Sequence, residues 1–170
     1  MARTIAIANQ KGGVGKTTTA VNLAASLAIA ERKTLLIDAD PQGNATSGVG
    51  IEKGSVERSL YDILIDGLSV KDVVRQDPQL PFLHVLPATQ DLVGAELELI
   101  GMPNRETILR GVIDAIQDDY EYILIDCPPS LNMLTLNVLT APDAVIIPIQ
   151  CEHYALEGIS QLLNTIRVVQ

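Results

Sequence analysis

The chain has 170 residues, of which 47% are hydrophobic, 19% charged and 3% aromatic, and its formal net charge is −9. This length suits one domain with a substantial core. The acidic balance argues against a nucleic-acid binder, because the twelve Lys and Arg residues are scattered along the chain. No apolar run reaches the roughly 18 residues that span a membrane, and no secretory signal precedes the first strand pattern, so we expect a soluble cytoplasmic protein.

The first strand pattern, TIAIA at residues 4–8, runs into the glycine-rich stretch NQKGGVGKTTT and then into a helix expected over residues 16–30. A strand, a glycine-rich loop and a Gly-Lys-Thr helix start in this order are typical of a phosphate-binding loop. The glycines let backbone N–H groups reach phosphate oxygens, and the helix dipole favours an anion there. We predict that Lys16 lies along the β- and γ-phosphates, Thr17 binds Mg²⁺ and Thr18 reaches the α-phosphate.

One position of this loop departs from the usual pattern G-x-x-x-x-G-K-[ST]. The pattern requires a glycine five residues before Gly15, and the sequence has Gln10 there, with Lys11 beside it. On residue type alone, Lys11 is either a solvated loop lysine or a second lysine with a role at the phosphates.

Two further strand patterns end in acidic residues. TLLID at residues 34–38 continues as ADPQGNATSG, which places Asp38 and Asp40 two residues apart, and YILID at residues 122–126 ends in Asp126. An apolar strand with a terminal Asp is the Walker B pattern, whose carboxylate orients Mg²⁺. Each acid alone is also compatible with a solvated or turn-capping role, but three strands that end beside one phosphate loop predict a nucleotide–Mg²⁺ site.

The rest of the chain continues this alternation of strands and helices. Residues 50–80 are irregular, with two short helical pieces. Beyond them the patterns predict strands at 82–87 and 144–149 and helices at 89–100, 104–117, 131–139 and 156–169. Strands that alternate with helices and are apolar nearly throughout indicate an α/β fold, with a mainly parallel sheet flanked by helices on both faces.

Smaller features add four expectations. The last helix reaches the final residue without a Gly or Pro stop signal, so we expect residues 1–170 to be a single domain that stops before its fold is complete. Cys127 and Cys151 form no C-x-x-C pair and are expected to be reduced, partly buried thiols. His84 lies in an apolar strand, and packing roles are expected for it and for His153.

The motifs together resemble a known family. KGGVGKTT, LLIDADPQGNATSG, YILIDCPPS and PIQCEHYALEG occur with the order and spacing of the ParA/Soj chromosome- and plasmid-partitioning ATPases. That family belongs to the deviant Walker A group of P-loop NTPases, together with MinD and the nitrogenase iron protein. The resemblance covers the whole chain and implies an ATPase that uses ATP and Mg²⁺. It would switch between a monomer and an ATP sandwich dimer in order to segregate chromosomes, plasmids or another cargo.

The resemblance also implies roles for single residues. Lys11 would reach across the dimer interface to the partner's nucleotide, where Gly12 would leave room, and Asp40 would position the attacking water. Asp38 would order the Mg²⁺ shell or the strand end, and Asp126 would be the Walker B acid. The expected catalytic residues are Lys11, Lys16 and Asp40. The expected ATP contacts are Lys11, Gly12, Gly13, Val14, Gly15, Lys16, Thr17 and Thr18. The expected metal ligands are Thr17, Asp38 and Asp126. The two expected switches are Pro41, Gln42, Gly43 and Asn44, and Pro128, Pro129 and Ser130.

Partners follow from the same resemblance. A ParB-like protein would activate hydrolysis, and non-specific DNA would be bound on the nucleoid, although typical members place their DNA-binding and adenine contacts beyond residue 170. The alternatives are a MinD-like membrane-positioning ATPase, which requires a C-terminal amphipathic helix, a non-hydrolysing nucleotide-binding scaffold, and an ATP-dependent ligase or synthetase of the same fold.

Overall fold

In the computed structural model, which describes residues 1–151 and 155–169, six strands form one sheet in the order β3-β4-β2-β5-β1-β6. Five of them run parallel: β1 (Arg3–Ile7), β2 (Thr34–Asp38), β4 (Leu83–Leu86), β5 (Tyr122–Asp126) and β6 (Ala144–Ile146). The sixth, β3 (Arg75–Gln76), pairs antiparallel with β4 at the edge of the sheet. The predicted mainly parallel sheet is confirmed, and β3 is a strand that the sequence patterns missed.

The register of the three central strands brings their last residues together. β5 lies between β1 and β2, and Asp126 at its end pairs with Ile7 of β1 and with Asp38 of β2. Because the strands are parallel, the loops that follow β1, β2 and β5 all leave the same edge of the sheet. Ligands of open parallel sheets bind at this carboxyl edge.

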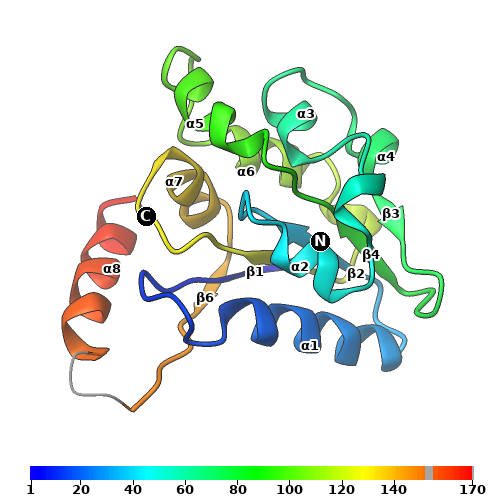
Figure 1. The fold of residues 1–170 in the computed structure, drawn as a ribbon, viewed down its shortest axis with the longest axis horizontal. Coiled ribbons are helices and arrows are strands. Elements are labelled where there is room, and N and C mark those ends of the chain that lie inside the picture. The colour runs from blue at the N-terminus through cyan, green and yellow to red at the C-terminus, as the bar shows by residue number, and fades with distance from the viewer. Residues whose placement is uncertain (152–154, 170) are drawn as a thin grey trace.

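Helices cover both faces of the sheet, with α1 along one face and α5, α6 and α7 over the other (Figure 1). The helices are α1 (Lys16–Ile29), α2 (Asn44–Gly48), α3 (Leu60–Leu64), α4 (Val70–Val73), α5 (Leu92–Ile100), α6 (Ile108–Asp114), α7 (Met133–Thr140) and α8 (Ala155–Val169). Two single 3₁₀ turns add η1 (Lys53–Ser55) and η2 (Gln117–Asp119). This layering confirms the predicted α/β class.

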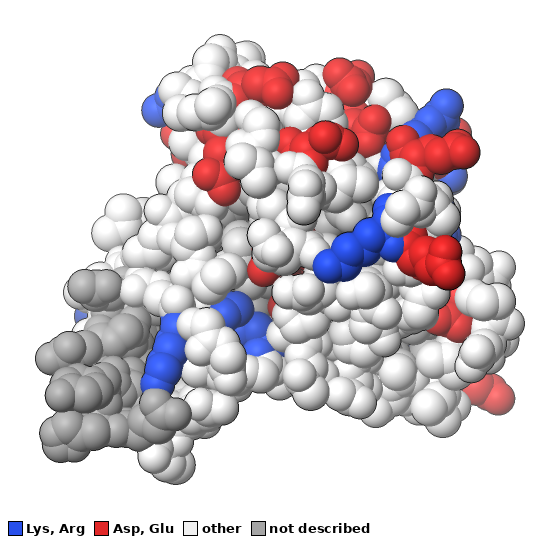
Figure 2. Space-filling view, viewed as in Figure 1, with Lys and Arg blue, Asp and Glu red and all other residues white. Residues whose placement is uncertain are grey.

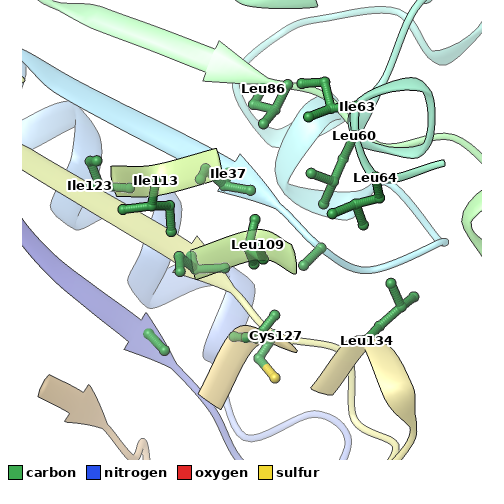
Figure 3. Close-up of a cluster of buried hydrophobic side chains, with 14 of the residues drawn as sticks. Ile37, Leu60, Ile63, Leu64, Leu86, Leu109, Ile113, Ile123, Cys127 and Leu134 are labelled. Carbon is green, nitrogen blue, oxygen red and sulfur yellow. The ribbon is translucent and has the colours of Figure 1, made fainter. Parts of the chain in front are cut away.

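Each of the five parallel strands contributes to two hydrophobic clusters, because successive side chains point to opposite faces of the sheet. On the α1 face, Leu36 packs with a row of alanines on the helix, namely Ala20, Ala24 and Ala28. On the other face, Ile37 belongs to a larger cluster that Figure 3 shows between the strands and the helices above them, with Leu60, Leu86, Leu109, Ile123, Cys127 and Leu134. Burial on both faces explains why the strand sequences are apolar almost throughout.

Some boundaries differ from the sequence patterns for local reasons. β6 ends at Ile146 and not at residue 149, and Pro148 has no N–H group with which to continue a ladder. α6 covers Ile108–Asp114 and not 104–117, because Asn104 has a φ of 54°, which lies in the left-handed region and excludes it from a helix. The expected helices therefore exist, and most of them are shorter than expected, whereas α8 begins one residue earlier.

The structure also tests the predictions made for the short helices, the last helix and His84. α3 and α4 are the two short helical pieces expected within residues 50–80, and α8 is the expected last helix. His84 Nδ1 lies 3.0 Å from the Tyr120 hydroxyl, a contact that suits the expected packing role. His153 lies outside the described residues, so its role stays a prediction. Within the part of the chain that is described, no helix combines the length and apolarity needed to cross a membrane.

Candidate functional site

The loop between β1 and α1 opens the site. Gly13 and Gly15 have φ angles of 73° and 90°, in the left-handed region that glycine adopts without a steric penalty. Gly15 is the N-cap of α1 and provides no side-chain hydrogen bond to the helix. The N–H groups of the first helical turn are therefore left for another acceptor, which is the arrangement that binds anions at a helix N-terminus.

Gly12 differs from the other two loop glycines. Its φ lies outside the left-handed region, and a Cβ atom built on it meets no atom within 4 Å. Neither backbone conformation nor crowding by the described part of this chain therefore requires a glycine at this position.

Side chains from both ends of the chain hold the loop in place. Asn9 Nδ2 donates to the carbonyl oxygen of Pro148 at 2.8 Å, and Asn9 Oδ1 accepts from the Lys11 backbone N–H at 3.0 Å. Gln150 Nε2 donates to the carbonyl oxygen of Gly13 at 3.0 Å. The segment after β6 thus supports the loop. The sequence patterns did not predict this supporting role of Asn9 and Gln150, because local sequence does not indicate a contact between residues so far apart in the chain.

Lys16 is buried at the start of α1, with 7% of its surface exposed. Its Nζ donates to the carbonyl oxygen of Lys11 at 3.0 Å, so the ammonium group lies within the curve of its own loop. Burial lowers the pKa of Lys16, and the nearby Asp126 and Asp40 carboxylates counteract that shift. An ammonium group has three donors, so one carbonyl partner leaves capacity for phosphate oxygens.

Asp126 faces Thr17 across the carboxyl edge of the sheet. Thr17 Oγ1 donates to Asp126 Oδ2 at 2.7 Å, whereas the buried Oδ1 has no hydrogen-bond partner within the described chain. Burial raises the pKa of Asp126 to about 7; the Thr17 hydrogen bond and Lys16 oppose this rise, and Asp38 and Asp40 add to it. An unpartnered carboxylate oxygen beside a hydroxyl is a donor set that fits a hard cation such as Mg²⁺.

Asp38 is committed to the turn that follows β2. Its Oδ2 accepts hydrogen bonds from both the backbone N–H and the hydroxyl of Thr46 at 2.7 Å, and its Oδ1 accepts from the Asp40 N–H at 3.1 Å. The Thr46 hydroxyl in turn accepts from the Ala88 N–H at 3.0 Å. Of the two roles expected for Asp38, this geometry favours ordering of the strand end, and its contact with the metal stays a prediction. Thr46 is a further residue that the sequence patterns did not single out.

Asp40 lies at the same site but has a different set of partners. Asp40 Oδ1 accepts from the Gln42 N–H at 2.8 Å, and its carbonyl oxygen accepts from the Gly43 N–H at 2.9 Å. Asp40 follows the end of β2, which pairs with the end of β5, and its charge acts on both Lys16 and Asp126. The turn of the first expected switch therefore starts at a charged group beside the loop.

The segment after β5 forms the second expected switch. Cys127 is buried, and burial raises the pKa of its thiol to about 12, so it is a packing group and not a nucleophile. Asn132 Nδ2 donates to Ser130 Oγ at 2.8 Å and also to Glu96 of α5, and Asn132 Oδ1 caps α7 by accepting from the Thr135 N–H at 3.0 Å. This switch is thereby tied to two helices. The other thiol, Cys151, is exposed, which corrects the expectation that both cysteines are partly buried.

Known proteins match the chain along its whole length. Residues 2–170 match a family described as an AAA domain. The chain is 58% identical over 170 residues to the sporulation initiation inhibitor protein Soj of Bacillus subtilis, and 55% identical over 168 residues to the chromosome partitioning protein ParA of Myxococcus xanthus. The chain belongs to the ParA/Soj family. It covers 67% of the length of that Soj protein and 59% of the length of that ParA protein.

Two solved structures similar to this ParA/Soj chain contain nucleotides. Cobyrinic acid a,c-diamide synthase from Mycobacterium smegmatis, with a bound ATP analogue and magnesium, is 40% identical with a TM-score of 0.94, over 100% of this chain and 69% of that one. A putative plasmid partition protein from Borrelia burgdorferi bound to AMPPNP is 29% identical with a TM-score of 0.87, over 99% of this chain and 70% of that one. The P-loop NTPase fold is confirmed, and the family is one that binds nucleotide and Mg²⁺.

Proposed function

We propose that this chain is the nucleotide-binding domain of a partitioning ATPase, which binds and hydrolyses Mg-ATP and alternates between a monomer and an ATP sandwich dimer. The observation that carries the proposal is the pair formed by Thr17 and Asp126 beside a glycine-rich loop. A buried carboxylate oxygen without a partner, next to a hydroxyl and a helix N-terminus, suits a cation and phosphates bound together.

The residues of the chain take distinct roles in this proposal. Lys16 exchanges the Lys11 carbonyl for the β- and γ-phosphates, and the loop N–H groups from Gly12 to Thr18 surround those phosphates. Thr17 and Asp126 hold Mg²⁺, which would neutralise charge on the β- and γ-phosphates when bound. Among the described residues no group of three or more His, Cys, Asp and Glu is arranged to hold a metal. A Mg²⁺ ion held by Thr17 and Asp126 would therefore need further oxygen ligands from the nucleotide or from water.

Hydrolysis requires an attacking water and charge neutralisation. Asp40 positions the water, and its place near Lys16 and Asp126 supports this role. Lys11 supplies a positive charge to the nucleotide of the partner subunit, as an arginine finger does. A Cβ atom built on Gly12 meets no atom of the described chain within 4 Å, so the loop leaves room there for the close approach that the proposed dimer requires.

The biological role in this proposal follows from the proteins that are most similar in sequence among those described above. Partitioning proteins share 49–58% identity with the chain, compared with 40% for the synthase structure, and this difference favours segregation of chromosomes, plasmids or another cargo over a synthetase reaction. A ParB-like activator, non-specific DNA as the surface on which the dimer moves, and a cytoplasmic, nucleoid-associated location are parts of the same proposal.

Calorimetric titration with Mg-ATP tests the site. Lys16→Ala removes the buried ammonium group, so we expect its heat of binding to disappear, whereas Lys71→Ala, which changes an exposed lysine on α4, should bind like the parent chain. Equal affinity of the parent chain and Lys16→Ala would refute the loop assignment. An absence of binding by the parent chain would refute the proposed function.

A further inference from the structure

Helix α5 presents an apolar stripe to solvent. Val93, Leu97 and Ile100 are 58%, 75% and 54% exposed, and their i, i+4, i+7 spacing places them on one face of the helix. The opposite face already packs into the core through Leu92, Ala95 and Leu99. The stripe therefore contributes nothing to the core, although it consists of large aliphatic side chains.

A neighbouring loop adds a further exposed aliphatic residue. Leu131 is 49% exposed, and it precedes Asn132, whose side chain donates to Glu96 of α5. Isolated surface hydrophobics are normal in proteins, but apolar side chains grouped on one helix face and bordered by polar residues mark an interaction site.

Carboxylates border this stripe. Glu96 lies beside the stripe, three residues after Val93 and four before Ile100, and Glu98 is an exposed residue further round the same helix. The Tyr61 hydroxyl of α3 donates to Glu98 at 3.0 Å, and this hydrogen bond, with the added charges of Asp66 and Asp91, raises the pKa of Tyr61. Figure 2 shows acidic side chains gathered over the part of the molecule where Figure 1 places α3 and α5.

Arg105, a basic residue beyond the end of α5, is already paired. Arg105 Nη1 donates to the carbonyl oxygen of Ile100 at 2.7 Å, and Arg105 Nε lies 2.9 Å from the Glu106 carboxylate. The field around the stripe is therefore negative, and this decides which occupant fits. A second copy docked by the same face would bring these carboxylates together, and nucleic acid or an anionic membrane would be repelled in the same way.

We propose that the α5 stripe, formed by Val93, Leu97 and Ile100, is the docking site for an amphipathic helix of a partner protein that carries Lys or Arg beside its apolar face. The apolar face covers the stripe, and the basic residues meet the carboxylates that border it. A partner segment of roughly three turns matches the length of α5.

Docking there also reaches the second expected switch. Glu96 borders the stripe and accepts from Asn132, which bonds to Ser130 in the segment that follows Asp126. A partner helix that shifts Glu96 would shift this segment as well. Docking itself does not require the proposed ATPase function, but this effect on the nucleotide site rests on it.

Fluorescence anisotropy with two labelled synthetic helices tests the docking site. One helix carries leucines on one face and lysines beside them; the other has glutamates in place of the lysines. We expect the Lys helix to bind more weakly as salt is added and the Glu helix not to bind. Leu97→Ser should weaken binding of the Lys helix about tenfold, whereas Ile29→Ser, at the exposed end of α1, should leave it unchanged.

Three results would overturn the proposal: no binding of the Lys helix, equal binding by the parent chain and Leu97→Ser, or ATP-independent dimers of the parent chain that Leu97→Ser abolishes. The last result would assign the stripe to a second copy. Lys16→Ala separates the two proposals, because it should lose Mg-ATP and still bind the Lys helix. Leu97 is exposed, so its substitution leaves the core intact.

Discussion

A carboxylate without exposed surface is costly to ionise, and Asp126 shows how the chain uses this property. Its pKa of about 7 follows mainly from burial, and among the described residues only the Thr17 hydroxyl donates to its carboxylate. The fold disfavours the ionised form of Asp126, because the carboxylate is buried and one of its oxygens has no donor among the described residues. A divalent cation bound there would stabilise that ionised form and lower the pKa of the group.

Asp126 should make the stability of the free chain depend on pH. Its pKa is about 7 in the folded chain, against an ordinary value of 3.8. Between these values the folded state binds more protons than the unfolded state, so the free energy of unfolding falls as pH rises through this window, by up to a few kcal/mol. Asp126→Asn should remove that part of the slope and stabilise the free chain at pH 8. Urea unfolding at pH 5 and pH 8 measures both effects, and identical slopes for the two proteins would contradict the prediction.

Asp38, at the end of β2, and Asp40, which follows it, should respond differently to substitution. Asp38→Ala leaves the buried Thr46 N–H and hydroxyl without their acceptor, so we expect a loss of about 2–4 kcal/mol in unfolding free energy. Asp40→Ala should change stability far less, retain ATP binding and lose hydrolysis. Denaturant unfolding and a phosphate-release assay check the pair. Normal turnover by Asp40→Ala would exclude Asp40 as the group that positions water.

At the scale of elements, the glycines of the β1–α1 loop serve two purposes. Gly15 has the left-handed backbone that caps α1, and Gly12 has neither that backbone nor a crowded neighbourhood. Gly15 is therefore required by the backbone conformation of the loop. In our proposal, Gly12 is required by the molecule that approaches the loop.

Alanine substitution should separate these purposes. Gly15→Ala places a Cβ on a residue with a φ of 90°, and we expect it to destabilise the free chain by roughly 1–2 kcal/mol. Gly12→Ala meets no atom within 4 Å and should not destabilise it. Thermal unfolding of both variants without nucleotide gives the comparison. A destabilised Gly12→Ala chain would show that the position has a role within the fold after all.

Elements that carry their own pattern were predictable, and elements made by distant contacts were not. β1, β2 and β5 are apolar runs that end where the loop chemistry starts, so the sequence placed Lys16, Thr17 and Asp126 at one edge. α2 has no apolar period, and the Asp38–Thr46 hydrogen bonds hold it in place. β3 is too short, at two residues, to show alternation.

The residues that hold the phosphate loop could not be predicted from the sequence, because they act through long-range polar contacts. Asn9 bonds to a residue 139 positions away, and Gln150 bonds to one 137 positions away. A single sequence gives no sign of such a pairing, because both residues are polar side chains next to loops. The phosphate loop was predictable as chemistry, whereas the means by which it is held required the structure.

At the scale of the whole molecule, the proposed dimer depends on a chain whose net charge is −9. Two such chains and two nucleotides repel one another at close range, so basic groups at the interface should have a large effect on assembly. Lys11 lies in the loop where the proposed partner subunit would arrive.

Lys11→Ala should therefore leave ATP binding by the monomer largely intact and abolish both the dimer and hydrolysis. Light scattering with and without Mg-ATP reports the mass, and Lys71→Ala, an exposed lysine on α4, serves as the matched control. An ATP-dependent increase in mass that persists in Lys11→Ala would exclude the proposed trans role.

The contacts that Asn9 and Gln150 make with the phosphate loop have a thermodynamic consequence. Glycine-rich segments lose more conformational entropy on ordering than other segments do. Here hydrogen bonds from Asn9 and Gln150 hold the loop, and Lys16 closes it onto the Lys11 carbonyl, before any nucleotide arrives. That entropy is lost during folding, so little of it opposes the ligand. Nucleotide should therefore bind with a small entropic penalty and without a slow loop-ordering phase.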